Sequence, residues 1–261
     1  MVLATGLSKL VGRGYDGWRV KEIEAVLFDL GDTIVHFETS KARGFLEAGT
    51  RPAYNRLIEW GFAPPRFPAY LRSVKRRFIA SIVWSRIVRR EAQLFNAFAK
   101  MHSAMGMKLR DEQMDELIFL CIPTIRQFFE IDHDAVGVAQ RLEAAGFKLG
   151  LVSNTLFPAA AIDDVLRAEG LLEPFPIRVY SSDVGYMKPH PRIYETALER
   201  IGVPANRTVF IGDRIDNDVR GPARVGMKTM LMIRNGHMPR GRGKPDYVIR
   251  RLTEVAAALG A

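Results

Sequence analysis

The residues best suited to chemistry are two acids, a glycine and a hydroxyl that follow a short apolar run. The run 26–28 ends abruptly at Asp29, Gly31, Asp32 and Thr33. An apolar run bounded by glycine is typical of a buried parallel strand, and a carboxylate at its C-terminal tip lies where open α/β sheets bind ligands. Asp29 is therefore expected to be presented to solvent on a rigid element, with a tight turn behind it. The alternative is that Asp29 only begins a turn or caps a helix.

Three later strand ends carry polar residues of complementary types, and in a parallel sheet they share one edge with Asp29. They offer a hydroxyl and an amide, then a lysine, then acids with a second amide: Ser153, Asn154, Lys188, Asp213, Asp216, Asn217 and Asp218. A hard divalent cation such as Mg²⁺ relieves the repulsion between clustered carboxylates. A lysine and a serine beside it can hold phosphate oxygens. Phosphoryl transfer through an aspartyl phosphate requires these groups.

Taken singly, some of these residues have simpler explanations. Ser153 and Asn154 are also compatible with a turn, and Lys188 with a solvated loop. Their common position directly after strands favours the functional interpretation, because it brings them to the same crevice as Asp29.

The order of predicted elements explains why these residues should meet. Strands are expected at 24–30, 147–152, 177–180, 208–211, 228–233 and 247–249. Helical periodicity fills most of the intervals between the later strands. Alternating units of this size predict an α/β fold, with a parallel sheet, right-handed crossovers and helices on both faces.

The domain organisation follows from a change of periodicity. Helical spacing of apolar residues replaces strand alternation between 39 and 132, which predicts an all-helical insertion after the first strand. We therefore divide the chain into an N-terminal extension, 1–22, a core formed by 23–38 and 133–261, and a helical insertion, 39–132.

Composition limits the cellular setting and the partners. The chain of 261 residues has a net charge of +9 and one cysteine, Cys121. These features, with no signal peptide or membrane span expected, favour the cytoplasm. The positive charge favours a small anionic substrate. A basic run without acids between Glu59 and Glu91 is best explained as a solvated helical face, with substrate contact as the alternative. Nucleic-acid binding ranks last because no groove-reading motif accompanies the charge.

The four motifs in this order resemble those of the haloacid dehalogenase (HAD) superfamily, most closely its phosphatase branch with a helical (C1-type) cap. The resemblance extends from about residue 22 to the end of the chain. It implies a Rossmann-like core with Asp29 as nucleophile and Mg²⁺ ligand, and the backbone carbonyl of Gly31 as another ligand. It also implies that Ser153 binds the transferring phosphoryl group, that Lys188 steadies its charge, and that Asp213 completes the metal site.

Two motifs need separate assignment. The second acid of the fourth motif falls on Asn217 or Asp218, and we favour Asp218 because a carboxylate balances Mg²⁺ better than an amide. Asp216 is better explained as a loop or capping residue. Gly31 stands where most family phosphatases place the aspartate that acts as general acid and base, and Asp32 follows one residue later. The shift redirects the side chain, so this role, typically worth about 10²–10⁴-fold, does not pass simply to Asp32.

The sequence therefore predicts a Mg²⁺-dependent phosphatase of a small phosphorylated metabolite, with Ser153, Asn154 and Lys188 binding the substrate. A 2-haloacid dehalogenase on the same fold is the first alternative, although that chemistry needs no metal and hence no acidic fourth motif. The second alternative is a catalytically weak protein that binds phosphate compounds or an acidic partner, and Gly31 keeps it open. The sequence makes no prediction of oligomeric state.

Overall fold

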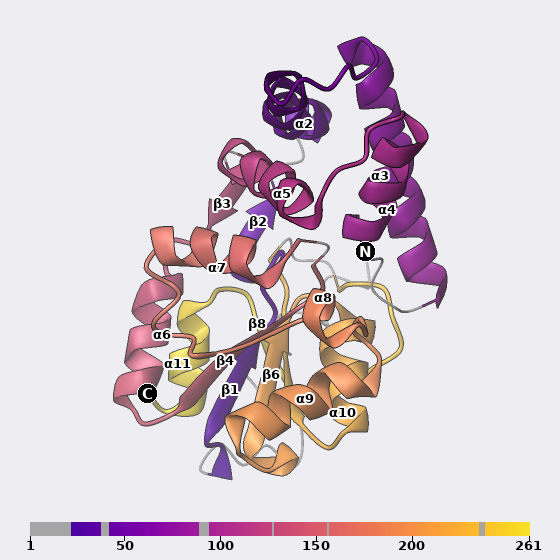
Figure 1. Cartoon of the computed structure of the whole chain (residues 1–261). Coiled ribbons are helices and arrows are strands. Elements are labelled where there is room, and N and C mark those ends of the chain that lie inside the picture. The colour runs from indigo at the N-terminus through magenta and orange to yellow at the C-terminus, as the bar shows by residue number, and fades with distance from the viewer. Residues whose placement is uncertain (1–21, 38–41, 89–93, 127, 156, 235–237) are drawn as a thin grey trace, which may run out of the picture.

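A parallel sheet of six strands forms the centre of the structure, a computed structural model (Figure 1). The structure describes residues 22–37, 42–88, 94–126, 128–155, 157–234 and 238–261, so the predicted extension lies outside it except for Glu22. The strand order is β5-β4-β1-β6-β7-β8. Their bounds are β1 (Ala25–Phe28), β4 (Lys148–Ser153), β5 (Ile177–Tyr180), β6 (Thr208–Gly212), β7 (Lys228–Met232) and β8 (Tyr247–Ile249). All six are predicted from the sequence, which confirms the α/β fold class.

Helices cover both faces of the sheet, as expected for a Rossmann-like core. Val26 of β1 faces an apolar cluster completed by α6 (Ala135–Ala144) and α11 (Thr253–Leu259). Leu27, the next residue, faces the opposite cluster, to which α9 (Pro191–Ile201) contributes. Both side chains are fully buried, which explains why the strand is a continuous apolar run rather than an alternating one.

Several short elements join the strands and carry the loops of the site. They are α7 (Ala159–Ala168), α8 (Ser181–Val184), η3 (Ala205–Arg207), the π-helical turn η4 (Ile215–Arg220) and α10 (Gly221–Arg224). α10 follows η4 directly, and Pro222 lies in its first turn.

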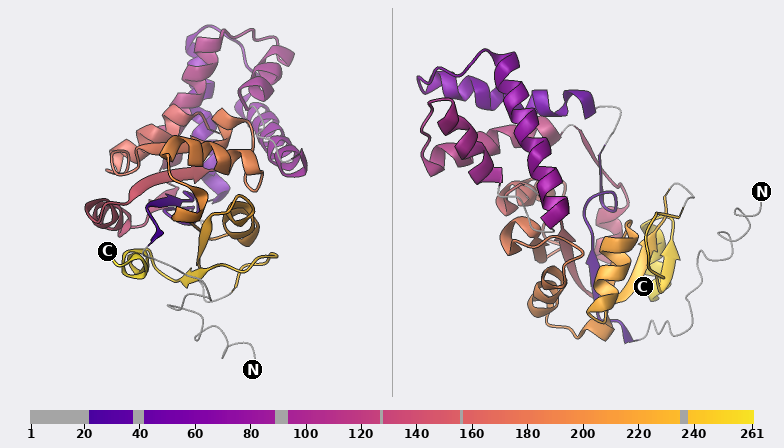
Figure 2. Two further views of the ribbon diagram at one scale, coloured as in Figure 1. Left: turned by 90° about the horizontal axis from the view of Figure 1, so that it is seen from below. Right: turned by 90° about the vertical axis from the view of Figure 1, so that its right-hand side faces the viewer.

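A group of helices lies between two short strands at one end of the molecule (Figures 1 and 2). We call residues 42–126 the helical insert; it contains α2 (Ala42–Glu59), α3 (Phe67–Val88), α4 (Leu94–Ala104) and α5 (Asp111–Arg126). It has its own apolar core, which includes Leu57, Tyr70 and Met114. On the sheet side, Ile122 of α5 shares a smaller cluster with Ala161 of α7.

The two short strands correct one expectation. No strand is expected between about 40 and 132, yet β3 (Phe129–Ile131) pairs antiparallel with β2 (Val35–Phe37). The insertion therefore begins after a second strand rather than after the first. Three residues are too few for strand alternation to stand out, and the partner strand lies about ninety residues earlier in the chain.

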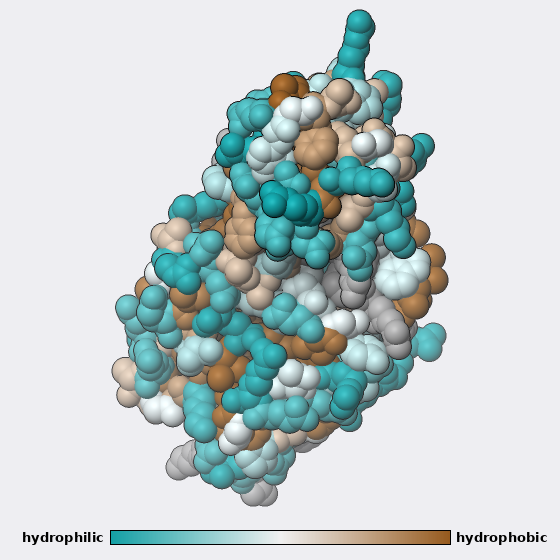
Figure 3. Space-filling view, in the orientation of Figure 1, coloured by the Kyte–Doolittle hydropathy of each residue, from teal (hydrophilic) through white to brown (hydrophobic). Residues whose placement is uncertain are grey.

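The surface is mostly hydrophilic in the view of Figure 3. In the basic run, Arg72 and Arg76 are exposed and Lys75 is half-buried, as expected for a solvated face, whereas Arg89 and Arg90 lie outside the described residues. In the part of the chain that the structure describes, every helix is too short or too polar to cross a bilayer.

Candidate active site

Asp29 occupies the carboxyl end of the central strand β1, where its carboxylate is fixed by short contacts. Its main-chain N–H donates to the carbonyl of Ile211 in β6 at 2.8 Å. Its Oδ1 accepts from the N–H of Leu30 at 2.7 Å and lies 2.7 Å from Nζ of Lys188. The side chain is only 8% exposed. A rigid, nearly buried carboxylate at this position is well placed to act as a nucleophile or as a metal ligand.

Lys188 bridges two of the predicted acids. Its Nζ lies 2.7 Å from Oδ1 of Asp29 and 2.8 Å from Oδ1 of Asp218, and its side chain is 1% exposed. Burial by itself lowers the pKa of Lys188, but the two carboxylates outweigh burial and raise the pKa overall. Burial also raises the pKa of Asp29, with Lys188 opposing this shift. Lys188 is therefore a fixed positive charge beside the candidate nucleophile.

Carboxylates from two distant parts of the chain meet at this point: Asp29 follows β1, whereas Asp213 and Asp218 both follow β6. Oxygen atoms of Asp29, Asp213 and Asp218 all lie within 4.8 Å of one another. Oδ1 of Asp213 is buried and has no hydrogen-bond partner among the described residues. Burial, together with Asp218 and Asp32, raises the pKa of Asp213 to about 6. An unpartnered oxygen among three acids and one lysine suits a hard divalent cation, which would supply the missing positive charge.

Asp218 is the most firmly held of the three acids. It is fully buried, its Oδ1 contacts Lys188, and its Oδ2 accepts from the N–H of Arg214 at 2.9 Å. Its role as a metal ligand remains a prediction, as does that of the alternative, Asn217. Both oxygens of Asp218 already accept hydrogen bonds. The geometry therefore favours a role for Asp218 in positioning Lys188.

Ser153 is the last residue of β4, which lies directly beside β1 in the sheet, and Asn154 follows it. Ser153 is buried, and among the described residues its hydroxyl makes one long hydrogen bond of 3.5 Å, to the carbonyl of Asn154. It therefore keeps capacity for a phosphoryl oxygen. The Asn154 amide makes two hydrogen bonds with the main chain of Lys188: Oδ1 accepts from the Lys188 N–H at 2.7 Å, and Nδ2 donates to its carbonyl at 3.1 Å. Substrate binding by Asn154 remains a prediction, and the geometry favours a positioning role.

The turn after β1 has its left-handed backbone conformation one residue after the glycine. The left-handed residue is Asp32, with φ of 57°, whereas Gly31 has no positive φ. A Cβ at Gly31 would meet nothing within 4 Å. The turn is closed by hydrogen bonds from Asp32 N–H to Val35 O and from Val35 N–H to Leu30 O, and neither uses the Gly31 carbonyl. Position 31 therefore has room for a side chain, and its carbonyl stays available as a ligand.

Comparison with known proteins decides the family. The sequence model of haloacid dehalogenase-like hydrolases matches residues 23–226, a span that contains every motif described above. The chain belongs to this family. The predicted superfamily membership is thereby confirmed, and the hydrolase fold accounts for the meeting of the four motifs.

Individual HAD relatives share the fold to different extents. A glyceraldehyde 3-phosphate phosphatase of Methanopyrus kandleri is 35% identical over 126 residues, which cover 47% of this chain and 53% of that protein. The chain thus spans about half the length of this curated relative. The structure of a HAD phosphatase from Thermococcus onnurineus superimposes with a TM-score of 0.61 at 26% identity, covering 91% of this chain and 98% of that one. A 2-haloacid dehalogenase from Pseudomonas syringae pv. Tomato DC3000 gives the same TM-score and coverage at 22% identity, which shows the common fold.

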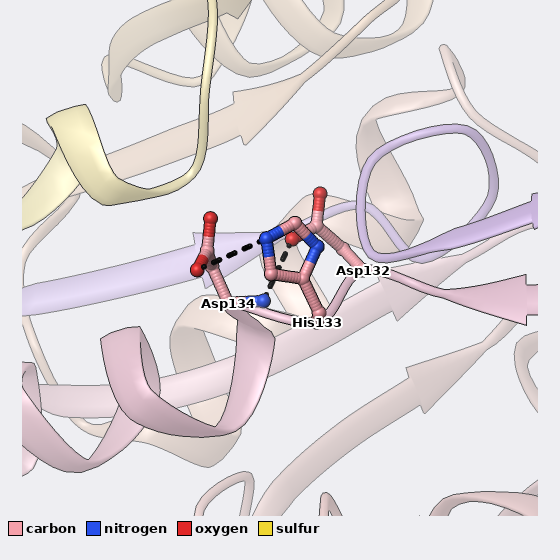
Figure 4. Close-up of side chains that lie close together, drawn as sticks. All are labelled: Asp132, His133 and Asp134. Carbon is pink, nitrogen blue, oxygen red and sulfur yellow. Dashed lines mark hydrogen bonds and ion pairs between the residues drawn. The ribbon is translucent and has the colours of Figure 1, made fainter.

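A second acidic group in this HAD chain is a weaker metal candidate. Asp132, His133 and Asp134 lie where β3 leads into α6 (Figure 4). Oδ2 of Asp132 is 2.7 Å from Nη2 of Arg234, and its Oδ1 accepts from the N–H of Asp134. Burial raises the pKa of Asp132, but these hydrogen bonds outweigh it and lower the pKa overall. Since the His133 side chain is 91% exposed and Asp132 is already paired, we favour the Asp29 group for the metal.

Two residues that position the HAD motifs, Tyr194 and Arg234, were not predicted from the sequence. Tyr194 donates a hydrogen bond to the carbonyl of Asn217, and a Cβ at Gly221 would collide with the Tyr194 hydroxyl. Arg234 donates to the carbonyl of Thr33 at 2.6 Å and so holds the turn after β1. Arg234 lies just beyond the end of β7. This position after a predicted strand is the feature of the sequence that could have identified Arg234 as a site residue.

Glycine at position 212 is required by the close approach of Asp218, because a Cβ there would overlap its carboxylate. We expect Gly212→Ala to displace Asp218 from Lys188, to cost about 1–3 kcal/mol of unfolding free energy, and to lower activity. Urea denaturation measures the loss. Gly137→Ala is the matched control, because a Cβ at this helical position meets nothing within 4 Å. Equal stability of the two variants would contradict the observed position of Asp218.

Proposed function

We propose that this chain is a Mg²⁺-dependent phosphatase that hydrolyses a small phosphorylated metabolite through an aspartyl phosphate on Asp29. The observation that carries the proposal is the unpartnered, buried oxygen of Asp213 among the carboxylates beside Lys188. The names of relatives support phosphate chemistry, since one is a glyceraldehyde 3-phosphate phosphatase and another a HAD phosphatase. The net charge of +9 favours an anionic substrate. We further propose a cytoplasmic location, consistent with the single cysteine.

The proposed reaction has two displacements at phosphorus. A carboxylate oxygen of Asp29 attacks the phosphorus atom while the bond to the leaving oxygen breaks. This step removes the negative charge of the Asp29 carboxylate. Lys188 then stabilises the phosphoryl oxygens, and the Ser153 hydroxyl donates a hydrogen bond to one of them. Water next attacks phosphorus, which releases phosphate and restores the Asp29 carboxylate.

The metal would be held by Asp29 and Asp213 together with the carbonyl of Gly31, with Asp218 as the further predicted ligand. It supplies positive charge where charge collects on the transferring group. The chain's own part is to hold these oxygens in place, through β1, β6 and the turn closed at Val35.

The site also bears on the alternatives. A 2-haloacid dehalogenase would use the same nucleophile without a metal, and then the buried Oδ1 of the half-buried Asp213 would add only uncompensated negative charge. A protein that binds phosphate compounds without turnover is the other alternative, and it rests on the missing acid at position 31. The phosphatase proposal accounts for Asp213, which the dehalogenase alternative does not.

Metal dependence separates these functions in one assay. We expect phosphate release from p-nitrophenyl phosphate in MgCl₂, loss of that activity in excess EDTA, and recovery when MgCl₂ is restored. Chloride release from 2-chloropropionate should stay at background. Chloride release that is insensitive to EDTA would establish the dehalogenase, and the absence of turnover on either substrate would favour the binding protein.

The glycine at position 31 predicts a strong dependence on the leaving group. Without an acid there, aryl phosphates, whose leaving groups need little protonation, should react much faster than alkyl phosphates in a single turnover. Because the position has room for a side chain, Gly31→Asp should fold and should accelerate alkyl phosphates by about 10²-fold or more, with a smaller effect on aryl phosphates. Equal single-turnover rates for both classes in the wild-type enzyme would refute this account of Gly31.

Asp32→Asn is the companion variant. Asp32 is exposed and has a left-handed backbone, which asparagine also tolerates. If Asp32 only shapes the turn, both substrate classes should change together and modestly. A loss confined to alkyl phosphates would instead identify Asp32 as the replacement acid.

A further inference from the structure

The helical insert contains a cavity of about 460 Å³, within the size range of small-molecule sites. Helices α2, α3, α4 and α5 form most of its wall. The wall is largely aromatic and aliphatic, and its larger apolar side chains include Phe45, Val74, Phe78, Phe98, Leu117 and Ile118. Its remaining side is formed by residues 157–159 and by Ser182 and Asp183, which belong to the core.

Four of the polar side chains in the helical wall, Thr50, Tyr70, His102 and Cys121, make hydrogen bonds within the protein. Thr50 donates to the carbonyl of Leu46, and Cys121 donates to that of Leu117. His102 contacts the carbonyl of Phe98 through Nδ1 and the Tyr70 hydroxyl through Nε2, each at 2.8 Å. Burial lowers the pKa of His102, which keeps the ring neutral. These groups therefore offer little to a polar ligand.

Charge in the cavity wall is also unsuited to a second anionic group. Among the described residues that line the cavity, Asp183 is the one charged side chain, and no lysine or arginine is present. A carboxylate or a second phosphate placed there would lose water without gaining a cation. An uncharged apolar group would bury its surface at no such cost.

The cavity lies beside the catalytic edge of the sheet. Residues 157–159 follow β4, whose last residue is Ser153, and Ser182 follows β5. The two loops are joined by a hydrogen bond from the Thr155 N–H to Oγ of Ser181 at 2.9 Å. Since β4 neighbours β1, the core side of the cavity follows strand ends on the same edge of the sheet as Asp29.

We propose that this cavity receives an uncharged apolar group of the substrate, so that the enzyme prefers amphiphilic phosphate monoesters to small, fully polar ones. The proposal rests on the phosphatase function proposed above. It assigns the choice of substrate to side chains of the helical insert. Ala159 lines the side of the cavity that is formed by the core.

Phenyl phosphates with 4-n-alkyl chains of increasing length test this preference, because the leaving-group pKa hardly changes along the series. Once the chain reaches the cavity, kcat/KM should rise about threefold to fourfold per added methylene and then level off. 4-(2-Carboxyethyl)phenyl phosphate, whose carboxylate is insulated from the ring and hardly alters the leaving-group pKa, should react less efficiently than the 4-n-butyl compound. A kcat/KM that is independent of chain length, or that favours the carboxylate, would overturn the proposal.

Two neighbouring alanines provide a matched pair of variants. Ala159 lines the cavity, whereas Ala160 is exposed and does not. In Ala159→Leu, the rise in kcat/KM with alkyl chain length should level off at a shorter chain, while kcat/KM for phenyl phosphate stays at the wild-type value. Ala160→Leu should behave as wild type. Should Ala159→Leu fail to fold, Phe78→Ala tests the opposite change and should shift the plateau to longer chains. Identical chain-length profiles in wild type and the folded cavity variant would contradict the assignment.

A measurement without turnover separates this proposal from the phosphatase proposal. 1-Hexanol should raise the melting temperature of the wild-type protein and of Ala160→Leu, and have less effect on Ala159→Leu. If hexanol stabilises in this pattern but no ester is hydrolysed, the cavity binds apolar groups and the phosphatase proposal fails. If esters are hydrolysed with no dependence on chain length, the cavity proposal fails and the phosphatase stands.

Discussion

Asp29→Asn is expected to abolish phosphate release, a loss on the order of 10⁶-fold, the scale seen when a covalent nucleophile is removed. An amide has the same shape as the carboxylate but neither attacks phosphorus nor ligates Mg²⁺ well. The fold should survive, because Lys188 keeps its contact with Asp218 at 2.8 Å. Initial rates on p-nitrophenyl phosphate and thermal melting of the same preparation measure the two effects.

Asp216→Asn is the matched control for this variant. Asp216 is an exposed acid of the fourth motif that pairs with Arg220 at 3.5 Å. The same substitution there should leave both the rate and the melting temperature near those of wild type. Retention of more than a few per cent of the Mg²⁺-dependent rate in Asp29→Asn would mean that another group is the nucleophile.

Lys188→Met is expected to be the most destabilising change in the site. It leaves the buried carboxylates of Asp29 and Asp218 without their cation. Removing one partner of a buried ion pair typically costs about 3–5 kcal/mol. Turnover should also fall strongly, because the phosphoryl charge loses its fixed partner. Chemical denaturation gives the free energy of unfolding, and rates are measured where the variant is folded.

Lys228→Met controls for the loss of a lysine from the same core. Lys228 pairs with Asp246 at 3.7 Å, and both side chains are about one-third exposed. Such a pair should contribute at most about 1 kcal/mol. MgCl₂ should raise the melting temperature of Lys188→Met more than that of wild type, because the cation can balance the same carboxylates. Equal destabilisation by the two lysine variants would argue against a buried charge cluster.

The meeting of the candidate site residues at one edge of the sheet was predictable, because the strands that carry them are short apolar runs with clear ends. Asp29, Ser153 and Asp213 each come at or directly after such a run, and the topology rules of parallel sheets bring them together. Lys188 was harder, since it lies in a loop beyond α8. Its position in the third motif identified Lys188 as a candidate. Its two hydrogen bonds with the Asn154 side chain explain how this loop residue is held in place.

The features that sequence reasoning missed depend on contacts between distant, aperiodic segments. The β2–β3 pair joins two three-residue strands, and Arg234 binds Thr33 across 201 positions. Neither leaves a periodic pattern in either segment. The positive φ of Asp32 was also unexpected, because a neighbouring glycine offered the usual place for it. The insert cavity required coordinates, since its walls come from four helices and two core loops.

Identification of the phosphorylated residue tests the central claim most directly. The wild-type enzyme is mixed with excess p-nitrophenyl phosphate and MgCl₂, quenched in acid within the first turnovers, and digested for mass spectrometry. Because no side chain at position 31 assists the attack of water, the intermediate should accumulate. We predict one phosphoryl group on the peptide that contains Asp29, absent from Asp29→Asn. A phosphoryl group on another residue, or p-nitrophenol formation with unmodified enzyme throughout, would contradict the account.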